Sequence, residues 1–227
     1  MFEEATIPVI TIDGPSGCGK GTIAQKLAIY LHWHWLDSGA LYRIVAWAVL
    51  HYQIPPSHDQ EISNLLNRLK INFTADSEGS AAQMSCDGHD VSQVIRTEAC
   101  AKMASEISAK PFVRQALLQR QRDLRQPPGL VTDGRDMGTV IFPDANVKFF
   151  LTASPEVRAL RRYNQLKKLG IESNFQQLCD DLADRDKRDR ERPIAPLQAA
   201  GDAIIIDTDT LTVNQVFAKV LEYIKES

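Results

Sequence analysis

The sequence of 227 residues has few of the features that mark secreted, membrane-bound or nucleic-acid-binding proteins. Its four cysteines are scattered, with no CxxC pair and no histidine at zinc-binding spacing, which argues against a disulfide framework or a zinc site. No apolar run approaches the roughly 20 residues that a membrane helix needs, and the first residues lack a signal-peptide pattern. A formal net charge of −3 gives no general attraction to nucleic acid or to anionic membranes. We therefore expect a cytoplasmic protein with no nucleic-acid or membrane partner.

The composition is that of a globular protein, with 44% hydrophobic and 24% charged residues. A chain of this length buries a sizeable core, and we expect one domain over residues 1–227, with room for an insertion. Because the chain carries no overall positive charge, any phosphate group must be bound by locally placed cations.

The stretch GPSGCGKGT, from Gly14 to Thr22, has the pattern of a phosphate-binding loop. It follows the apolar run Val9–Asp13, which predicts a buried strand, and it precedes a helical pattern from Ile23 to Leu31. Glycines let the backbone point N–H groups at an anion, and Lys20 adds a full positive charge near the helix N-terminus. The alternative is an ordinary glycine-rich turn, which the flanking strand and helix make less favoured. The candidate ATP-phosphate-binding residues are Gly14, Pro15, Ser16, Gly17, Cys18, Gly19, Lys20, Gly21 and Thr22.

Two residues of this loop leave questions open. Gly21 stands where such loops usually carry the Ser or Thr whose hydroxyl holds Mg²⁺, and Thr22 follows one position later. Cys18 lies near a helix N-terminus and a lysine, a setting that favours a reactive thiolate. The alternative for Cys18 is a small side chain that fills space.

Compact apolar runs separated by helical sequence predict a parallel sheet. Residues 130–133, 147–151 and 203–207 have the composition of strands buried on both faces. With residues 9–13 and the segment near 33–36 they make about five strands of a three-layer α/β/α fold. Ligands of such sheets bind beyond the carboxyl ends of the strands. Four acidic residues fall at these ends, namely Asp13, Asp37, Asp133 and Asp207.

The sequence pattern changes between the strands predicted near residues 33–36 and at 130–133, where a small β-rich insertion is expected. Residues 71–74 and 83–86 predict short strands, separated by the turn-forming stretch Asp76–Ser80 and followed by a turn at Asp87-Gly88. Helical patterns cover residues 23–31, 40–52, 61–70, 97–109 and 111–125.

A charged cluster, Asp133-Gly-Arg135-Asp136, directly follows a predicted buried strand. An Asp at this position of phosphate-loop proteins can hold Mg²⁺, often through water. Arg135 and Asp136 then face the same cleft with opposite charges. A polar loop with a local salt bridge is the alternative.

A second cluster, DRDKRDRER at residues 184–192, is the densest charge run of the chain. Helical spacing puts Arg185, Arg188 and Arg192 on one face, where guanidinium groups can clamp phosphates. A solvated helix face is the alternative. Arg43, at the start of a helix beyond the second strand, is a further candidate phosphate ligand, with a plain surface arginine as its alternative.

Four stretches together resemble the motifs of bacterial cytidylate kinases, which are nucleoside monophosphate kinases of the P-loop type. They are ITIDGPSGCGKGT, LDSGALYR, DGRDMGTVIFPDA and DRDKRDRERPIAPL, and their order and spacing match over nearly the whole chain. The resemblance implies a core sheet, a monophosphate-binding insert at residues 62–105 and a mobile arginine-rich lid at about 170–197. It also implies transfer of the γ-phosphoryl group of ATP to CMP or dCMP with Mg²⁺, by a monomer.

The resemblance assigns roles to particular residues. It implies catalytic roles for Lys20, Arg135, Arg185 and Arg188. The implied CMP contacts are Ser38, Arg43, Ser105, Arg114, Asp133, Arg135, Asp136, Arg185, Asp189 and Arg192. The implied Mg²⁺ contacts, in part through water, are Thr22 and Asp133.

Hydrogen-bond chemistry supports several of these roles. The exocyclic amine of cytosine can donate to Asp136 and Ser105, whereas its N3 and O2 acceptors suit Arg114 or Arg192. Uracil reverses the pattern at Asp136 and should be selected against. The acceptor phosphate of CMP is already ionised at neutral pH, so no strong general base is required.

Two rival interpretations stay open at this point. One is a kinase of another small acceptor, such as adenylate or shikimate, on the same scaffold. The other is a nucleotide-dependent switch, although the Asn-Lys-x-Asp element of guanine-specific switches is missing from the sequence.

Overall fold

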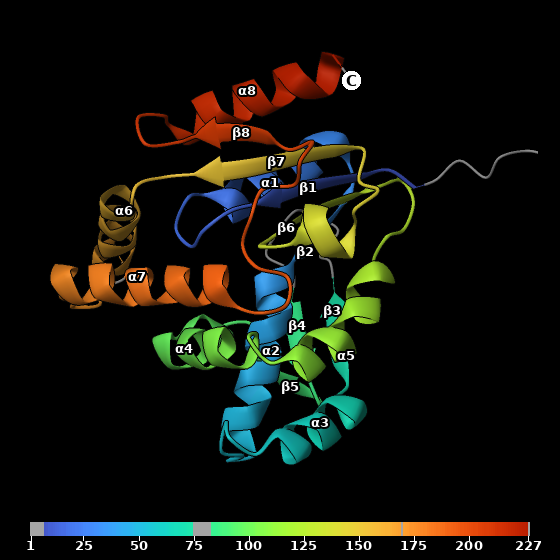
Figure 1. Ribbon diagram of the computed structural model, residues 1–227, viewed down its shortest axis with the longest axis vertical. Coiled ribbons are helices and arrows are strands. Elements are labelled where there is room, and N and C mark those ends of the chain that lie inside the picture. Colours follow the sequence, from blue (N-terminus) through green and yellow to red (C-terminus); the bar gives the residue numbers. More distant parts are fainter. Residues whose placement is uncertain (1–6, 75–82, 169, 227) are drawn as a thin grey trace, which may run out of the picture. The chain divides into compact units, whose positions relative to one another are not determined.

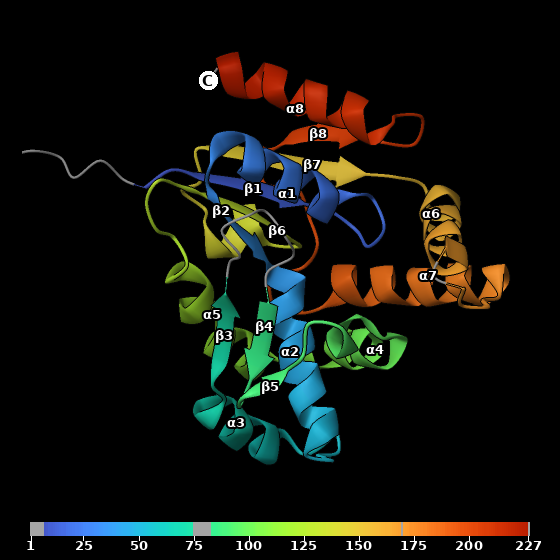
Figure 2. The same cartoon turned by 180° about the vertical axis from the view of Figure 1, so that it is seen from behind.

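The computed structural model describes residues 7–74, 83–168 and 170–226, and two compact units can be distinguished in it (Figures 1 and 2). The first, here called the core unit, comprises Met1–Leu36 and Arg122–Ser227. The second, the inserted unit, comprises Asp37–Gln121. The predicted turn at Asp76–Ser80 lies outside the described residues.

The core unit is built on a five-stranded parallel sheet, as the sequence predicts. Its strand order is β2-β6-β1-β7-β8, so the strand that precedes the phosphate loop, β1, lies in the middle. The strands are β1 (Val9–Asp13), β2 (His34–Asp37), β6 (Leu130–Gly134), β7 (Val147–Thr152) and β8 (Ile204–Asp207). The α/β class and the five-stranded count are therefore confirmed.

Helices of the core unit cover the sheet and extend beyond it (Figure 1). They are α1 (Lys20–Leu31), the π-helical turn η2 (Met137–Ile141), α6 (Pro155–Lys168), α7 (Phe175–Glu191) and α8 (Val213–Glu226). The π-helical turn is not predicted by the sequence pattern.

Every residue of β1 is buried, and its side chains alternate between the two faces of the sheet. Ile10 and Ile12 pack in one cluster with apolar residues of α1 and α8, which lie on that face. Thr11 points to the opposite face, where its hydroxyl approaches Gly138 of η2. The central strand is thus fixed from both sides, and its carboxyl end is held firmly where the phosphate loop begins.

The inserted unit consists mainly of helices around a small antiparallel sheet. Its elements are α2 (Ser38–His51), α3 (Asp59–Arg68), β3 (Ile71–Thr74), β4 (Gln83–Cys86), β5 (His89–Asp90), η1 (Val94–Arg96), α4 (Glu98–Ile107) and α5 (Pro111–Arg122). The sheet has the order β3-β4-β5. The sequence predicts β3 and β4 but not β5, because two exposed polar residues give no strand pattern. The monophosphate-binding role of residues 62–105 stays a prediction.

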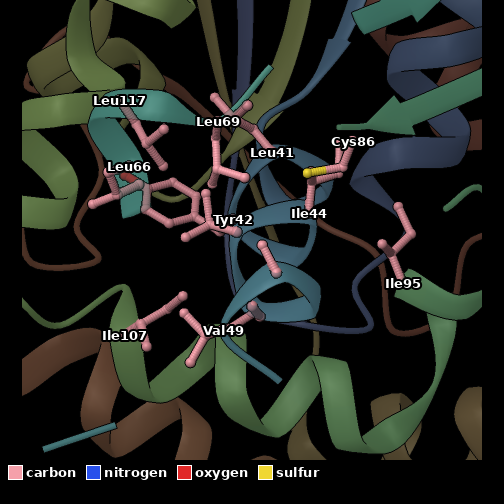
Figure 3. Close-up of a cluster of buried hydrophobic side chains, with 14 of the residues drawn as sticks. Leu41, Tyr42, Ile44, Val49, Leu66, Leu69, Cys86, Ile95, Ile107 and Leu117 are labelled. Carbon is pink, nitrogen blue, oxygen red and sulfur yellow. The ribbon is translucent and has the colours of Figure 1, made fainter. Parts of the chain in front are cut away.

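The core of the inserted unit forms around α2, whose apolar side chains point in several directions (Figure 3). Ile44, Val45 and Val49 are fully buried there. A helix that is apolar on most of its surface needs partners on several sides, and α3, α4, α5 and β4 supply them.

Element ends differ from the predicted ones by a few residues, with local causes. Helix α1 begins at Lys20, three residues earlier than predicted, because Gly19 adopts a left-handed conformation (φ 96°) that leads directly into the helix. Helix α2 begins at Ser38 because the Asp37 carboxylate accepts a hydrogen bond from Ala40 N at 2.9 Å. Among the described helices, none is both long and apolar enough to cross a membrane.

We expect Phe149→Ala to lower the free energy of unfolding by about 3–5 kcal/mol. Phe149 is 1% exposed on β7 and packs in the core of the sheet, so its removal leaves a cavity. Urea unfolding would measure the loss. The matched control is Ile205→Ala on the neighbouring strand, where the side chain is 64% exposed and the cost should stay below about 0.5 kcal/mol. Equal losses in both variants would contradict this description of the core.

Candidate functional site

The loop between β1 and α1 has the backbone geometry of an anion-binding turn. Gly14, Gly17 and Gly19 all have positive φ values, of 145°, 83° and 96°. A Cβ on Gly14 would lie 2.1 Å from the carbonyl oxygen of Leu151, so no side chain fits there. The glycines predicted from sequence are therefore required by both conformation and space.

Lys20 is the first residue of α1, and its ammonium group is buried at the base of this loop. Nζ donates a hydrogen bond to the carbonyl oxygen of Pro15 at 2.7 Å and lies 3.8 Å from Sγ of Cys18. Burial lowers the pKa of Lys20, and the nearby positive charges of Arg135 and Arg185 lower it further. The charges of both arginines thus act on the buried ammonium group, an arrangement that favours a bound polyanion.

Cys18 is buried in the same loop, with 2% of its surface exposed. Its thiol donates to the carbonyl oxygen of Pro15 at 3.2 Å. The contact and the burial agree with a side chain that fills space; the thiolate hypothesis stays a prediction.

Asp133 lies beside the phosphate loop because β6 pairs with β1 in parallel. The register joins Ile12 to Asp133, so both strands end at the same edge of the sheet. One carboxylate oxygen of Asp133 accepts from Trp35 Nε1 at 3.2 Å, and the other lies 3.7 Å from the position that a Cβ on Gly21 would take. The carboxylate therefore borders the Gly21-Thr22 end of the loop.

This donor set fits Mg²⁺, although no group of three or more His, Cys, Asp or Glu in the described ranges could hold a metal ion by itself. Mg²⁺ in phosphoryl-transfer sites keeps several waters and takes only one or two protein ligands, with substrate phosphates completing its shell. The Asp133 carboxylate beside Gly21, with the hydroxyl of Thr22 one residue further along the chain, supplies donors of that kind and number.

Asp13 ends β1 and caps the η2 turn. Its two carboxylate oxygens accept from Met137 N at 2.9 Å and from Gly138 N at 2.8 Å. Burial raises the pKa of Asp13 to about 6, and the two N–H donors oppose that rise. The segment that carries Arg135 and Asp136 is thereby tied to the end of the central strand.

Helix α7 carries the predicted lid arginines, and ion pairs connect its C-terminal part to the segment after β6. Arg135 Nε donates to Asp189 at 2.7 Å, and Arg192 approaches Asp136 at 3.3 Å. Burial by itself would raise the pKa of Asp189, but the charge and hydrogen bond of Arg135 bring it below its usual value. Four predicted CMP-binding residues therefore occur as two ion pairs.

The sequence predicts Arg185, Arg188 and Arg192 on one helical face, but only the first two lie within the helix. Helix α7 ends at Glu191, and Arg192 follows it with extended backbone. Arg188 Nε donates to the carbonyl oxygen of Asp184 in its own helix, at 3.3 Å. The charge of Arg185 helps to lower the pKa of Lys20.

Sequence reasoning missed a buried ion pair between α6 and α7, which lie side by side (Figures 1 and 2). Arg158 of α6 meets Asp186 of α7 through two hydrogen bonds, at 3.0 and 2.5 Å. Arg158 also donates to the carbonyl oxygen of Ser16 in the phosphate loop, at 3.1 Å. Asp186 is one of several acids in the charge run, and nothing in the spacing distinguishes it.

The remaining predicted CMP contacts belong to the inserted unit. Arg43 pairs with Asp37 at 2.7 Å near the start of α2, where Ser38 is buried. Ser105 of α4 is 4% exposed, and within the described residues its hydroxyl has no hydrogen-bond partner. Arg114 of α5 is buried, and its guanidinium lies 5.5 Å from the ring centroid of Tyr42.

A glycine-rich loop between a buried parallel strand and a helix, with a buried lysine and an arginine-bearing helix nearby, defines the class of P-loop kinases. A family model described as cytidylate kinase matches residues 10–226. The chain therefore belongs to the cytidylate kinase family and is an ATP-dependent nucleoside monophosphate kinase of that specificity.

Individual relatives agree with this assignment. The cytidylate kinase of Nitrosococcus oceani is 53% identical over 218 residues, which cover 96% of each chain. That of Coxiella burnetii is 50% identical over 219 residues, or 96% of this chain and 92% of that protein. A solved structure of an uncharacterized protein from Eubacterium ventriosum has a TM-score of 0.51 at 12% identity and covers 97% of this chain and 99% of its own, a likeness of fold alone.

We expect Asp13→Asn to change how stability depends on pH. The folded-state pKa of about 6 exceeds the ordinary value of 3.8, so the folded protein binds more protons than the unfolded chain between these values. The contribution of this carboxyl group to stability is therefore present at low pH and is lost as the pH rises through 6. Asparagine does not titrate, so the wild type should lose up to about 3 kcal/mol relative to the variant between pH 3.5 and 7.5. Urea unfolding across this range would measure it, and a constant difference would contradict the burial-raised pKa.

Proposed function

We propose that the protein transfers the γ-phosphoryl group of ATP to CMP or dCMP, giving ADP and CDP or dCDP. The observation that carries the proposal is the phosphate-binding loop itself, with three glycines at positive φ and the buried ammonium group of Lys20, whose pKa the charges of Arg135 and Arg185 lower. A triphosphate bound here would offset the repulsion among these cations.

In the proposed ATP site, the backbone N–H groups from Gly14 to Thr22 surround the phosphates, and Lys20 reaches the outer ones. Thr22 and Asp133 would hold Mg²⁺, directly or through water. The ion, when bound, supplies neutralisation of the charge on the transferred phosphoryl group.

In the proposed CMP site, Asp136 and Ser105 accept from the cytosine amine, and Arg114 or Arg192 donates to N3 and O2. The buried hydroxyl of Ser105, which has no hydrogen-bond partner among the described residues, supports this role, because a buried polar group without a partner is costly unless a ligand satisfies it. Arg43, Arg135 and Arg185 bind the phosphate, with Ser38, Asp133 and Asp189 as further contacts.

The proposed mechanism is one of positioning and charge neutralisation. The attacking phosphate oxygen of CMP is ionised at neutral pH, so the protein need not remove a proton. Lys20, Arg135, Arg185 and Arg188 stabilise the charge that spreads over the transferred group. Closure of the lid, at about residues 170–197, excludes the water that would otherwise hydrolyse ATP.

We propose further that the enzyme works as a cytoplasmic monomer. Its four cysteines are free thiols, as is usual in a reducing compartment, and both nucleotide substrates are cytoplasmic metabolites. The one-domain interpretation of residues 1–227 belongs to the same proposal.

Lys20→Ala should lower kcat at least a hundredfold, because the only full charge of the phosphate loop is lost. A coupled assay of ADP release with ATP, Mg²⁺ and CMP would measure this. Lys26→Ala on the same helix is the matched control, since its ammonium contacts only Asn214 and the ring of Phe217 among the described residues. Turnover retained in Lys20→Ala, with Tm within a few degrees of the control, would refute the role.

Arg188→Ala should also lower kcat by orders of magnitude without unfolding the protein, if the arginine reaches the phosphates on lid closure. In the structure Arg188 is bonded only within its own helix among the contacts seen, so its loss should leave Tm nearly unchanged. Full activity of the variant would remove Arg188 from the mechanism.

In a side-by-side assay of CMP, dCMP, UMP, AMP and GMP, we expect strong turnover with the two cytidine nucleotides only. Ser105→Ala should lower kcat/KM for CMP about two- to tenfold by removing one neutral hydrogen bond, and leave the KM for ATP unchanged. Ser108→Ala is the control, because that hydroxyl donates to the carbonyl oxygen of Ser105 near the end of the same helix. Turnover of AMP in place of CMP would favour the rival kinase, and equal turnover of UMP would remove the cytosine contacts.

A further inference from the structure

Arg158 is one of the most buried side chains of the molecule and connects three segments of the core unit. It is 1% exposed, and its Nε donates to the carbonyl oxygen of Ala153 at 3.0 Å. One terminal nitrogen donates to the carbonyl oxygen of Ser16 in the phosphate loop, and both terminal nitrogens donate to Asp186 on α7. The guanidinium group therefore joins the phosphate loop directly to the lid helix.

The contact with the phosphate loop is close. A Cβ on Gly17 would lie 3.1 Å from Cβ of Arg158, so the aliphatic part of the arginine packs under the loop backbone. On the other side of the loop, the carbonyl oxygen of Cys18 accepts from the Thr208 hydroxyl at 3.3 Å. Both contacts hold the loop, but among the contacts of the described residues only the one from Arg158 continues to α7.

A buried ion pair by itself adds little to the free energy of unfolding. Removing two charges from water costs several kcal/mol, and apolar residues of similar volume often stabilise a fold equally well. What the pair provides is geometry, because a bidentate guanidinium–carboxylate contact fixes both distance and orientation. A second cation near Asp186, Arg190, lies 3.9 Å away with a side chain 61% exposed, and a contact of that kind fixes little.

The position of Asp186 on α7 connects this geometry to the reaction. Asp186 immediately follows Arg185, whose charge acts on Lys20, and it precedes Arg188 by two residues. A shift or rotation of α7 at Asp186 would move both arginines with respect to the phosphate loop. Mutations that displace reacting groups by about 1 Å can lower rates about a hundredfold.

We propose that Arg158 and Asp186 form a positioning pair that sets the distance and rotation of α7 with respect to the phosphate loop, and so presents Arg185 and Arg188 to the phosphates. The pair touches no substrate. This inference rests on the proposed roles of Lys20, Arg185 and Arg188, and it adds two residues that act through them.

Asp186→Asn should lower kcat about ten- to a hundredfold and change the KM for ATP less than threefold, because the loop backbone and Lys20 still bind the nucleotide. The ratio of CDP formed to ATP hydrolysed should also fall, since a misplaced lid admits water. Asp184→Asn removes the same charge from an exposed position of the same helix and should leave both quantities unchanged.

Arg158→Lys provides a second variant that retains the buried positive charge but cannot make the bidentate contact. It should reproduce the split between kcat and KM, and the double variant should lose no more activity than the weaker single variant. Wild-type kcat in either variant, assayed well below its Tm, would overturn the proposal. A lower Tm with unchanged kcat would show a purely structural pair and would overturn it equally.

Hydrogen exchange of α7 separates this inference from the proposed function. Adding Mg²⁺ and ATP to the full-length wild-type protein should slow exchange over residues 175–191, and the effect should be lost in Asp186→Asn but kept in Asp184→Asn. Protection that persists in Asp186→Asn would overturn the positioning role, whether or not CMP is phosphorylated. If the wild type forms no CDP yet shows this pattern, the proposed acceptor is wrong and the positioning pair stands.

Discussion

The burial of a single ammonium group, that of Lys20, is the constraint on which the rest of the core unit depends. An ammonium group taken out of water without a carboxylate partner is held at a cost of several kcal/mol. Lys20 meets the carbonyl oxygen of Pro15 instead, and the nearby guanidinium groups of Arg135 and Arg185 add to the cost. The fully buried strand β1 and the left-handed glycines keep the loop, and with it the lysine, in this unfavourable position. A site held in this way gains most when an anion with several charges enters it.

Acidic side chains near this site pair with its arginines and so reduce its excess positive charge. The loop from Gly14 to Thr22 itself contains no acidic residue. Asp189 pairs with Arg135, Asp136 with Arg192 and Asp186 with Arg158. This balance explains how a chain with a net charge of −3 can still present a cationic centre. In the proposed function, Asp136 and Arg192 give up their ion pair when CMP binds, and each of them then contacts the base. The lost ion pair is replaced by hydrogen bonds to the ligand, and only a ligand with matching donors and acceptors makes this exchange favourable.

The fold could be predicted from the sequence because its strongest signals are local and repeated. A run such as Val9–Asp13, apolar on both faces, has few alternatives to a buried parallel strand, and Gly14, Gly17 and Gly19 need no tertiary information to indicate a turn. Features with a non-local cause were missed. The π-helical turn η2 depends on the Asp13 carboxylate, more than a hundred residues away in sequence, which accepts from Met137 N and Gly138 N. The two-residue strand β5 exists only because β4 offers it a partner.

The same distinction separates the site residues. Lys20, Arg135 and Asp136 lie in motifs whose spacing carries their chemistry, whereas Arg158 lies in a helix with two other arginines and Asp186 in a run with three other acids. Their pairing is visible only once α6 and α7 are in place.

The ion pairs that involve α7 and the residue after it also differ in whether a bound nucleotide can replace them. Arg158 is bonded to the backbone carbonyl oxygens of Ala153 and Ser16 in addition to Asp186, and neither Arg158 nor Asp186 is assigned to a substrate in the proposal. Arg135, Asp189, Asp136 and Arg192 are instead residues assigned to CMP in the proposal. A helix with one contact that persists and others that are replaced by ligand can turn about the persistent contact. For α7 that contact is Asp186, which lies next to Arg185 in sequence. Lid movement about this point would therefore displace the N-terminal part of the helix most and Arg185 least, and Arg185, whose charge acts on Lys20, would keep its position while the remainder of the lid closes.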